Sequence, residues 1–237
     1  MYDMEQIKAT WNTIKERLIE ESGFEDFLRG KVDYCDWRYR QCKYLPEGIW
    51  GASGATRMVF GLDSDRTVVF KMLKDRDDIN YNESEAFIYQ RAVEAGLAQW
   101  FAWTAKVDTI NYDGVVTEIY AMEYCDVDAD ALEENSRELA IQEYLEDEGK
   151  SLDEMDEDEK EQMYGWCEDG CGDSEGICHY MYAIYDNDDM DALYGFINDY
   201  NINDTHCGNW GYSNGQMKLI DFGGYERNVI EMARECA

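Results

Sequence analysis

Apolar residues recur at helical spacing near the start of the chain and change to short strand-like runs farther along. Residues 4–20 carry one apolar face, formed by Ile7, Trp11, Ile14, Leu18 and Ile19, and this period predicts a helix. Residues 49–73 contain β-branched apolar runs split by a turn-like segment at 61–65, which predicts a hairpin. Residues 103–124 predict two more strands that turn at 111–114.

The remaining periodic segments favour helices. Helices are predicted at 82–95, 129–148 and 189–199. The first two end at a glycine, Gly96 and Gly149 respectively, which is a typical helix stop signal. Ser151 and Glu154 have the spacing of a capping box ahead of another acidic helix. A short strand at 216–220 leads into Asp221.

This order of elements predicts an α+β protein with a mostly antiparallel N-terminal sheet and a helical, strongly acidic C-terminal part. We expect an N-terminal helical extension at residues 1–47, a sheet-containing lobe at 48–125 and a reduced, mostly helical lobe at 126–237. No internal repeat and no Gly/Ser-rich or Pro-rich linker divides the chain.

Composition narrows the classes of function. The chain has 237 residues and a formal net charge of −32, so its field repels nucleic-acid phosphate and anionic membrane surfaces. No apolar run reaches about 18 residues, as a membrane span requires, and the first residues do not form a secretory signal. Eight cysteines without such a signal indicate reduced thiols. We therefore expect a cytoplasmic protein that binds neither membranes nor nucleic acid directly.

The negative charge is concentrated in one third of the chain. Residues 126–200 hold 26 acidic and 3 basic side chains, which is 23 of the 32 net charges. This run is either a solvated face or a docking surface for a basic protein partner. In contrast, five basic residues gather between 57 and 76, where an anionic ligand would find a positive cradle; they are Arg57, Arg66, Lys71, Lys74 and Arg76.

One cluster of possible zinc ligands lies within the acidic third. Thiolates and imidazole are the usual ligands of zinc, and here they are Cys167, Cys171, Cys178 and His179. Their spacing matches no strong zinc pattern. They are therefore either a metal site or scattered free cysteines beside a histidine.

Two N-terminal motifs could bind phosphate. Gly51, Ser53 and Gly54 lie in a small-residue segment between two predicted strands, where backbone N–H groups could face phosphate oxygens. Lys71 ends an apolar strand, and Glu85 or Glu83 begins the following helix. Each feature also has a purely structural explanation, as a hairpin turn, an edge lysine or a helix-dipole partner.

Two C-terminal motifs are more specific. The segment Asp204-Thr-His-Cys-Gly-Asn209 lies twelve residues before Asp221-Phe222-Gly223. Together with the N-terminal motifs, this order resembles the protein-kinase-like phosphotransferases, with a Gly-rich loop, a strand lysine, a helix glutamate, a D-x-x-x-x-N loop and a DFG motif. The D-x-H-x-G-N form is similar to that of aminoglycoside-type small-molecule kinases, and the general style resembles kinase-like proteins of bacteriophages.

The resemblance implies a role for each matching residue. In the N-terminal half, Gly51, Ser53 and Gly54 would cover the phosphates of ATP. Lys71 would contact the α- and β-phosphates and would be held by Glu85. Glu123 lies in the segment Met122-Glu123-Tyr124, which resembles the connection between the two lobes of a kinase.

In the C-terminal half, Asp204 would accept the proton of the attacking hydroxyl, or orient it. Asn209 and Asp221 would bind Mg²⁺, which prefers oxygen ligands. His206 is expected to scaffold the loop. Ile202-Asn203 departs from the His-Arg or His-Gly that usually precedes the aspartate, and Gly223 is followed by 14 residues, too few for the usual peptide-holding helices.

Two functions follow as hypotheses. The first is an ATP- and Mg²⁺-dependent phosphotransferase that acts on a protein hydroxyl of a basic partner or on itself; a small-molecule substrate is a weaker version. The second is an inactive kinase-like binding protein whose acidic lobe mimics nucleic acid and blocks a nucleic-acid-binding protein, as an anti-defence or host-takeover factor would. Either would act in the host cytoplasm if a phage encodes the chain.

Overall fold

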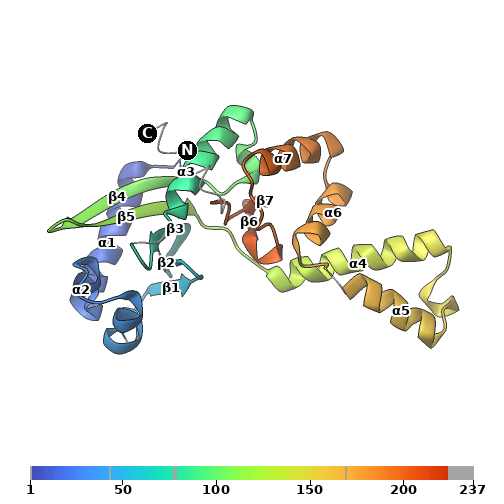
Figure 1. The fold of residues 1–237 in the computed structure, drawn as a ribbon, viewed down its shortest axis with the longest axis horizontal. Coiled ribbons are helices and arrows are strands. Elements are labelled where there is room, and N and C mark those ends of the chain that lie inside the picture. Colours follow the sequence, from blue (N-terminus) through green and yellow to red (C-terminus); the bar gives the residue numbers. More distant parts are fainter. Residues whose placement is uncertain (1, 43, 77–78, 169, 224–237) are drawn as a thin grey trace. The chain divides into compact units, whose positions relative to one another are not determined.

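The computed structural model describes residues 2–42, 44–76, 79–168 and 170–223. The chain divides into two compact units, and each is described by itself (Figure 1). The first contains the described residues up to Arg91 together with Ala102–Tyr124. The second contains Ala92–Phe101 and the described residues from Cys125 onward.

The first unit is built on a five-stranded antiparallel sheet with strand order β1-β2-β3-β5-β4. Its strands are β1 (Ile49–Ser53), β2 (Arg57–Leu62), β3 (Asp65–Leu73), β4 (Thr104–Tyr112) and β5 (Val115–Glu123). Asp113 and Gly114 both have positive φ, 53° and 92°, which suits the tight turn between β4 and β5. The strands predicted at 103–124 are therefore confirmed.

Helices of the first 47 residues cover one face of this sheet. They are α1 (Met4–Ser22), α2 (Phe24–Leu28) and a π-helical segment at Asp36–Gln41. Phe70 of β3 packs against Trp11, with ring centroids 5.4 Å apart, and Phe60 of β2 packs against Phe24. The predicted helix at 4–20 is confirmed, and the described residues of the first 47 belong to the same compact unit as the sheet.

The other face of the sheet contacts α3 (Tyr81–Ala95). Side chains alternate between the faces of a strand, so Phe70 points toward α1 while Lys71 points toward α3. The helix ends at Gly96, whose φ of +75° is the left-handed conformation favoured after a helix. The predicted helix at 82–95 is thereby confirmed. Lys71 is the lysine of β3 that contacts this helix.

The second unit is mostly helical. Its helices are α4 (Ala129–Glu148), α5 (Glu157–Glu168), α6 (Ser174–Ile184) and α7 (Asn187–Asp199), and its hairpin is β6 (Trp210–Ser213) with β7 (Gln216–Leu219). The predictions for 129–148 and 189–199 are confirmed. The capping box of Ser151 and Glu154 exists, but it caps a single 3₁₀ turn rather than α5.

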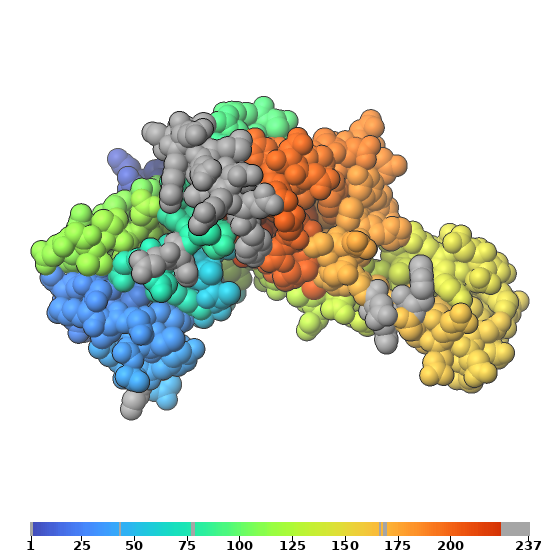
Figure 2. All heavy atoms as spheres, viewed as in Figure 1, coloured from blue at the N-terminus to red at the C-terminus, as the bar shows by residue number. Residues whose placement is uncertain are grey.

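Helices α4 and α5 pack against each other as a helical hairpin, which is yellow in Figure 2. Met155, Met163 and Cys167 are buried against apolar side chains of α4, namely Ala140, Ile141, Tyr144 and Leu145. Most of the remaining surface of the two helices is acidic. Helices α4 and α5 of the acidic third thus pack on a small apolar core, and their acidic side chains lie outside it.

No helix in the described part of the chain is long and apolar enough to cross a membrane. The fold class is α+β, with an antiparallel five-stranded sheet toward the N-terminus and a mostly helical part after it.

The packing of α1 on the sheet can be tested with Leu18→Ala. Leu18 is fully buried in the core of the first unit, so the substitution should lower the free energy of unfolding by about 2–5 kcal/mol. Asn12→Ala on the exposed face of α1 is the control and should change it by less than about 0.5 kcal/mol. Urea unfolding followed by circular dichroism measures both. Equal effects would show that α1 is not part of the core.

Candidate functional site

Lys71 is held by a buried carboxylate. Its ammonium lies 3.0 Å from Oε1 and 2.9 Å from Oε2 of Glu85, and 3.6 Å from Sδ of Met122. The side chains of Lys71 and Glu85 are 7% and 0% exposed. Of the two candidate carboxylates of α3, Glu85 is thus the one for which contact with Lys71 is observed. Burial, followed by the charge and the hydrogen bond of Glu118, raises the pKa of the Tyr120 hydroxyl, and the charge of Glu83 adds to this shift.

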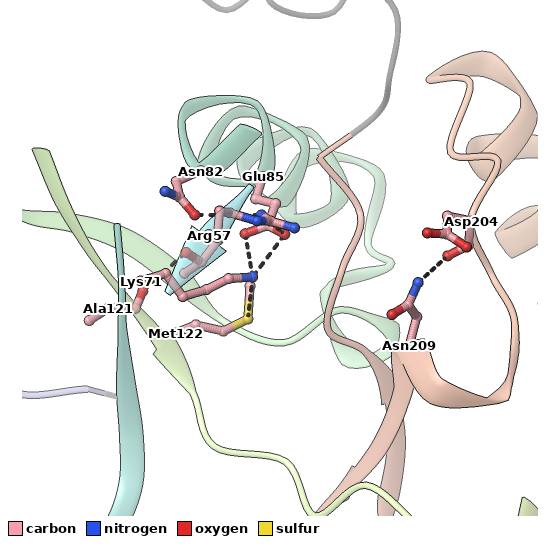
Figure 3. A network of polar contacts seen from close by, with 9 residues as sticks. Arg57, Lys71, Asn82, Glu85, Ala121, Met122, Asp204 and Asn209 are labelled. Atoms are coloured by element: carbon pink, nitrogen blue, oxygen red, sulfur yellow. Dashed lines mark hydrogen bonds and ion pairs between the residues drawn. The ribbon is translucent and has the colours of Figure 1, made fainter. Parts of the chain in front are cut away.

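Arg57 is a third charged member of this site, which sequence reasoning did not select. Its Nη1 lies 2.7 Å from Oε1 of Glu85 and 3.5 Å from Oδ1 of Asn82. Figure 3 shows Arg57 and Lys71 converging on the Glu85 carboxylate from two strands. We refer to Arg57, Lys71 and Glu85 as the buried charge triad. The cluster of basic residues between 57 and 76 was the only sequence signal for Arg57.

The glycine segment forms the end of the β1–β2 hairpin. Gly54 N–H donates to the carbonyl of Arg57 at 3.1 Å, which closes the turn. A Cβ on Gly51 would come within 2.8 Å of Leu45 Cδ1 and 3.1 Å of the Val59 carbonyl. Gly51 is therefore needed for close packing beneath the hairpin. Gly54 has no neighbour that a Cβ would meet within 4 Å, and Ser53 is exposed at the end of β1.

Glu123 is buried at the end of β5. It is 3% exposed, and its Oε2 accepts a hydrogen bond from the Trp103 backbone N–H at 3.1 Å. Its own N–H donates to the Trp103 carbonyl at 2.7 Å. Burial, with the nearby Glu123 charge, raises the pKa of the Tyr89 hydroxyl. The side chain of Glu123 thus helps to fix the end of the sheet.

In the second unit, the predicted catalytic loop is locked by its own hydrogen bonds. Asn209 Nδ2 donates to the Asp204 carbonyl at 2.9 Å (Figure 3), and Asn209 N–H donates to the His206 carbonyl at 2.9 Å. His206 Nδ1 accepts from Gly208 N–H at 3.0 Å, while its Nε2 lies 3.3 Å from Oδ1 of Asp204. A neutral His206 therefore carries its proton on Nε2, facing Asp204. The scaffolding role expected for His206 agrees with these contacts.

Residues outside the predicted motif support this loop. Trp210 Nε1 donates to the Thr205 carbonyl at 2.9 Å, and Thr205 N–H donates to Oγ of Ser174 at 3.1 Å. Ile202 is buried and donates its N–H to Ile197 at the end of α7. Burial, followed by the charge of Glu133, raises the pKa of the Cys207 thiol. These contacts hold the loop from α6, α7 and β6.

The β6–β7 hairpin brings the loop and the Asp221 motif together. Trp210 pairs with Leu219, and the Ile220 N–H donates to the Asn209 carbonyl at 2.9 Å. Asp221 follows directly. Phe222 is buried against Phe101, with ring centroids 5.1 Å apart. Two motifs that are twelve residues apart in sequence therefore meet at one end of a hairpin.

One amide oxygen and one carboxylate near this end of the hairpin are of the ligand types that Mg²⁺ accepts. The Asn209 amide nitrogen is used as a donor toward Asp204, so its remaining oxygen is a neutral ligand of the kind that Mg²⁺ accepts. Mg²⁺ usually takes one or two carboxylates and keeps several waters or phosphate oxygens. Asn209 and Asp221 carry ligand atoms of these kinds.

No group of three or more His, Cys, Asp or Glu side chains suited to hold a metal occurs among the described residues. The proposed zinc ligands have other contacts. Cys171 Sγ donates to the Cys167 carbonyl at 2.5 Å, and His179 Nε2 lies 2.5 Å from Oε2 of Glu143. Burial raises the pKa of both the Cys167 and the Cys171 thiol. These features favour free cysteines over a zinc site.

Comparison with models of known protein families gives no match, and comparison with curated proteins gives no significant match.

The buried charge triad makes a stability prediction. Glu85→Leu would leave two cations at one buried position, and we expect a loss of about 3–5 kcal/mol in the free energy of unfolding. Lys71→Met leaves the Arg57–Glu85 pair intact and should cost less. Urea unfolding of the two variants gives the order. A larger loss for Lys71→Met would show that Arg57 does not share the carboxylate.

Proposed function

We propose that this protein is an ATP- and Mg²⁺-dependent phosphotransferase of the protein-kinase-like type, which transfers phosphate to a protein hydroxyl on a basic partner or on itself. One observation carries the proposal most: the buried pair of Lys71 on β3 and Glu85 on α3. A strand lysine held by a helix glutamate is the arrangement that positions the phosphates of ATP in protein kinases.

Support from the second unit is independent. A loop carrying Asp204 and Asn209 is joined to Asp221 through the backbone of a short hairpin. In phosphoryl transfer a carboxylate orients the nucleophile or accepts its proton, and oxygen side chains hold the metal. Asn209 and Asp221 would bind Mg²⁺, which would neutralise phosphate charge.

The roles of the protein's own groups follow from charge. Lys71 would neutralise phosphate oxygens, and its ammonium would be fixed by Glu85. Asp204 would take the proton from the substrate hydroxyl as the oxygen forms a bond to the γ-phosphorus and the bond to ADP breaks. His206 would steady the Asp204 carboxylate from its Nε2 side. Gly51, Ser53 and Gly54 would cover the phosphates, and Glu123 would lie in the segment beside the base.

The charge of the chain indicates the class of substrate. Residues 126–200 carry 23 net negative charges, and all three basic side chains of this region are paired with local carboxylates: Arg137 with Glu133, Lys150 with Glu159 and Lys160 with Glu157. A positively charged protein would therefore be attracted over a long range. This favours a basic protein substrate over a small anionic metabolite.

A second candidate function rests on the same surface. A binding protein without catalysis would use the α4–α5 hairpin to occupy the nucleic-acid site of a basic partner in the host cytoplasm. The two functions differ in what they require, because binding needs the acidic surface while transfer needs the lysine and the oxygen ligands.

Phosphate transfer from labelled ATP tests the first function. Asp204→Asn removes the proton acceptor, and we expect transfer to a Lys- and Arg-rich test protein, or to the chain itself, to fall by about 10²–10⁴-fold. Asp221→Ala and Lys71→Ala should abolish it. The control is Asp153→Asn on the acidic surface, which should retain activity. Equal transfer by the wild type and Asp221→Ala would dispose of the proposal.

Partner capture tests the second function. Neutralising the acidic residues between 153 and 161 by Asp→Asn and Glu→Gln substitution should weaken binding of a Lys- and Arg-rich test protein and reduce its salt dependence. Asp221→Ala should leave that binding unchanged. Binding that survives both neutralisation and high salt would exclude the acidic surface as the contact.

A further inference from the structure

Arg57 links the glycine hairpin to the buried carboxylate. It is the first residue of β2, and its backbone carbonyl accepts the hydrogen bond from Gly54 that closes the turn. Its side chain extends to Glu85, with 2.7 Å between Nη1 and Oε1. One residue therefore joins the turn, through its backbone, to α3, through its guanidinium.

Lys74 contacts the same turn through its backbone and its side chain. Its N–H donates to the Thr56 carbonyl at 2.9 Å, and its ammonium contacts the carbonyl of Gly54. These contacts fix the backbone of the turn against the end of β3. Lys74 thus contacts the backbone of the turn, whereas Arg57 contacts the Glu85 carboxylate.

We propose that Arg57 is a positioning residue for phosphoryl transfer, an inference that rests on the function proposed above. It acts through Glu85: the guanidinium fixes one carboxylate oxygen, so the carboxylate holds Lys71 in one orientation. It also ties the glycine hairpin to that same carboxylate. The two elements expected to contact the phosphates are thereby set relative to each other.

The chemistry of arginine suits this task. Its guanidinium is always charged and planar, so it keeps a fixed direction toward the carboxylate. The side chains of Arg57 and Glu85 are 8% and 0% exposed, and charge-assisted hydrogen bonds in such surroundings are short and strong. A simple packing role would need the length of the side chain but not its charge.

This role makes a selective prediction about ligands. Arg57 influences the part of the site that would meet phosphates, so its loss should affect ATP and leave adenosine unaffected. A general loosening of the fold would weaken both. The ratio of the two affinities therefore separates positioning from structural support.

The experiment compares wild type, Arg57→Met, Arg57→Lys and, as a control, Arg137→Met, which removes the same charge from a half-exposed pair on α4. We expect Arg57→Met to lower kcat/KM for ATP by about 10²-fold. It should also weaken Mg²⁺-ATP binding while adenosine binding stays constant. Arg57→Lys should recover part of the loss, and Arg137→Met should behave as wild type. Titration calorimetry and steady-state kinetics give these values.

A double-mutant cycle with Glu85→Gln tests the route of the effect. If Arg57 acts through Glu85, the loss in the double variant should be smaller than the product of the two single losses. If Arg57→Met fails to fold by circular dichroism, Arg57→Lys with Glu85→Gln completes the cycle. Independent, multiplying effects would overturn the proposal.

The remaining outcomes separate this inference from the proposed function. Wild type that binds no Mg²⁺-ATP overturns both. Wild type that binds and turns over ATP, with Arg57→Met equal to it, overturns only the role of Arg57. Equal loss of ATP and adenosine in Arg57→Met assigns the residue to structural support and also overturns it.

Discussion

A carboxylate buried to 0% exposure sets the strictest condition on the first unit. An ionised Glu85 without partners would be very costly in a low-dielectric interior, so β2, β3 and α3 must deliver Arg57 and Lys71 to it at hydrogen-bonding distance. The pairing of Val59 with Lys71 fixes the register between β2 and β3. A one-residue slip would turn Lys71 to the opposite face, among the aromatic residues under α1.

In the second unit, none of the charged side chains that the structure describes is buried, and the loop is held in another way. Hydrogen bonds within the Asp204–Asn209 loop, together with one from the indole of Trp210, brace the loop. The β6–β7 pairing then places Asp221 beside Asn209. The positions of the candidate residues in this unit are thus set by hydrogen bonds to the main chain and by aromatic packing. In the first unit it is set by ionic contacts between side chains.

The sequence predicted the elements whose signals are local. The 3.6-residue period predicted α1. The ends predicted for α3 and α4 from Gly96 and Gly149 were correct. Helix α6 was missed because its glycine, cysteine and tyrosines have weak helical preference, while its stability comes from burying Ile177 and Met181. The strand β6 was missed because its four residues are too few to show alternation.

The contacts of the candidate site were predictable only in part. The sequence paired Lys71 with Glu85, and the structure brings them into contact; the sequence also grouped Asp204 with Asn209, which share a hydrogen bond. Arg57 could not be assigned, because an arginine after a glycine turn has the same sequence signature whether it faces solvent or a carboxylate. Only the pairing of β2 with β3, a long-range property, places it over α3. His206 was assigned to the loop scaffold from its position alone, and its two contacts agree with that.

The α4–α5 hairpin has a thermodynamic consequence of its own. Among the described side chains, three buried residues and a few partly buried apolar residues of α4 form the core of this hairpin, while like charges on the same helices repel each other. Counterions in the surrounding solvent reduce that repulsion. We therefore expect this segment to open locally, with a protection against hydrogen exchange that rises with ionic strength by more than that of the apolar core beneath α1.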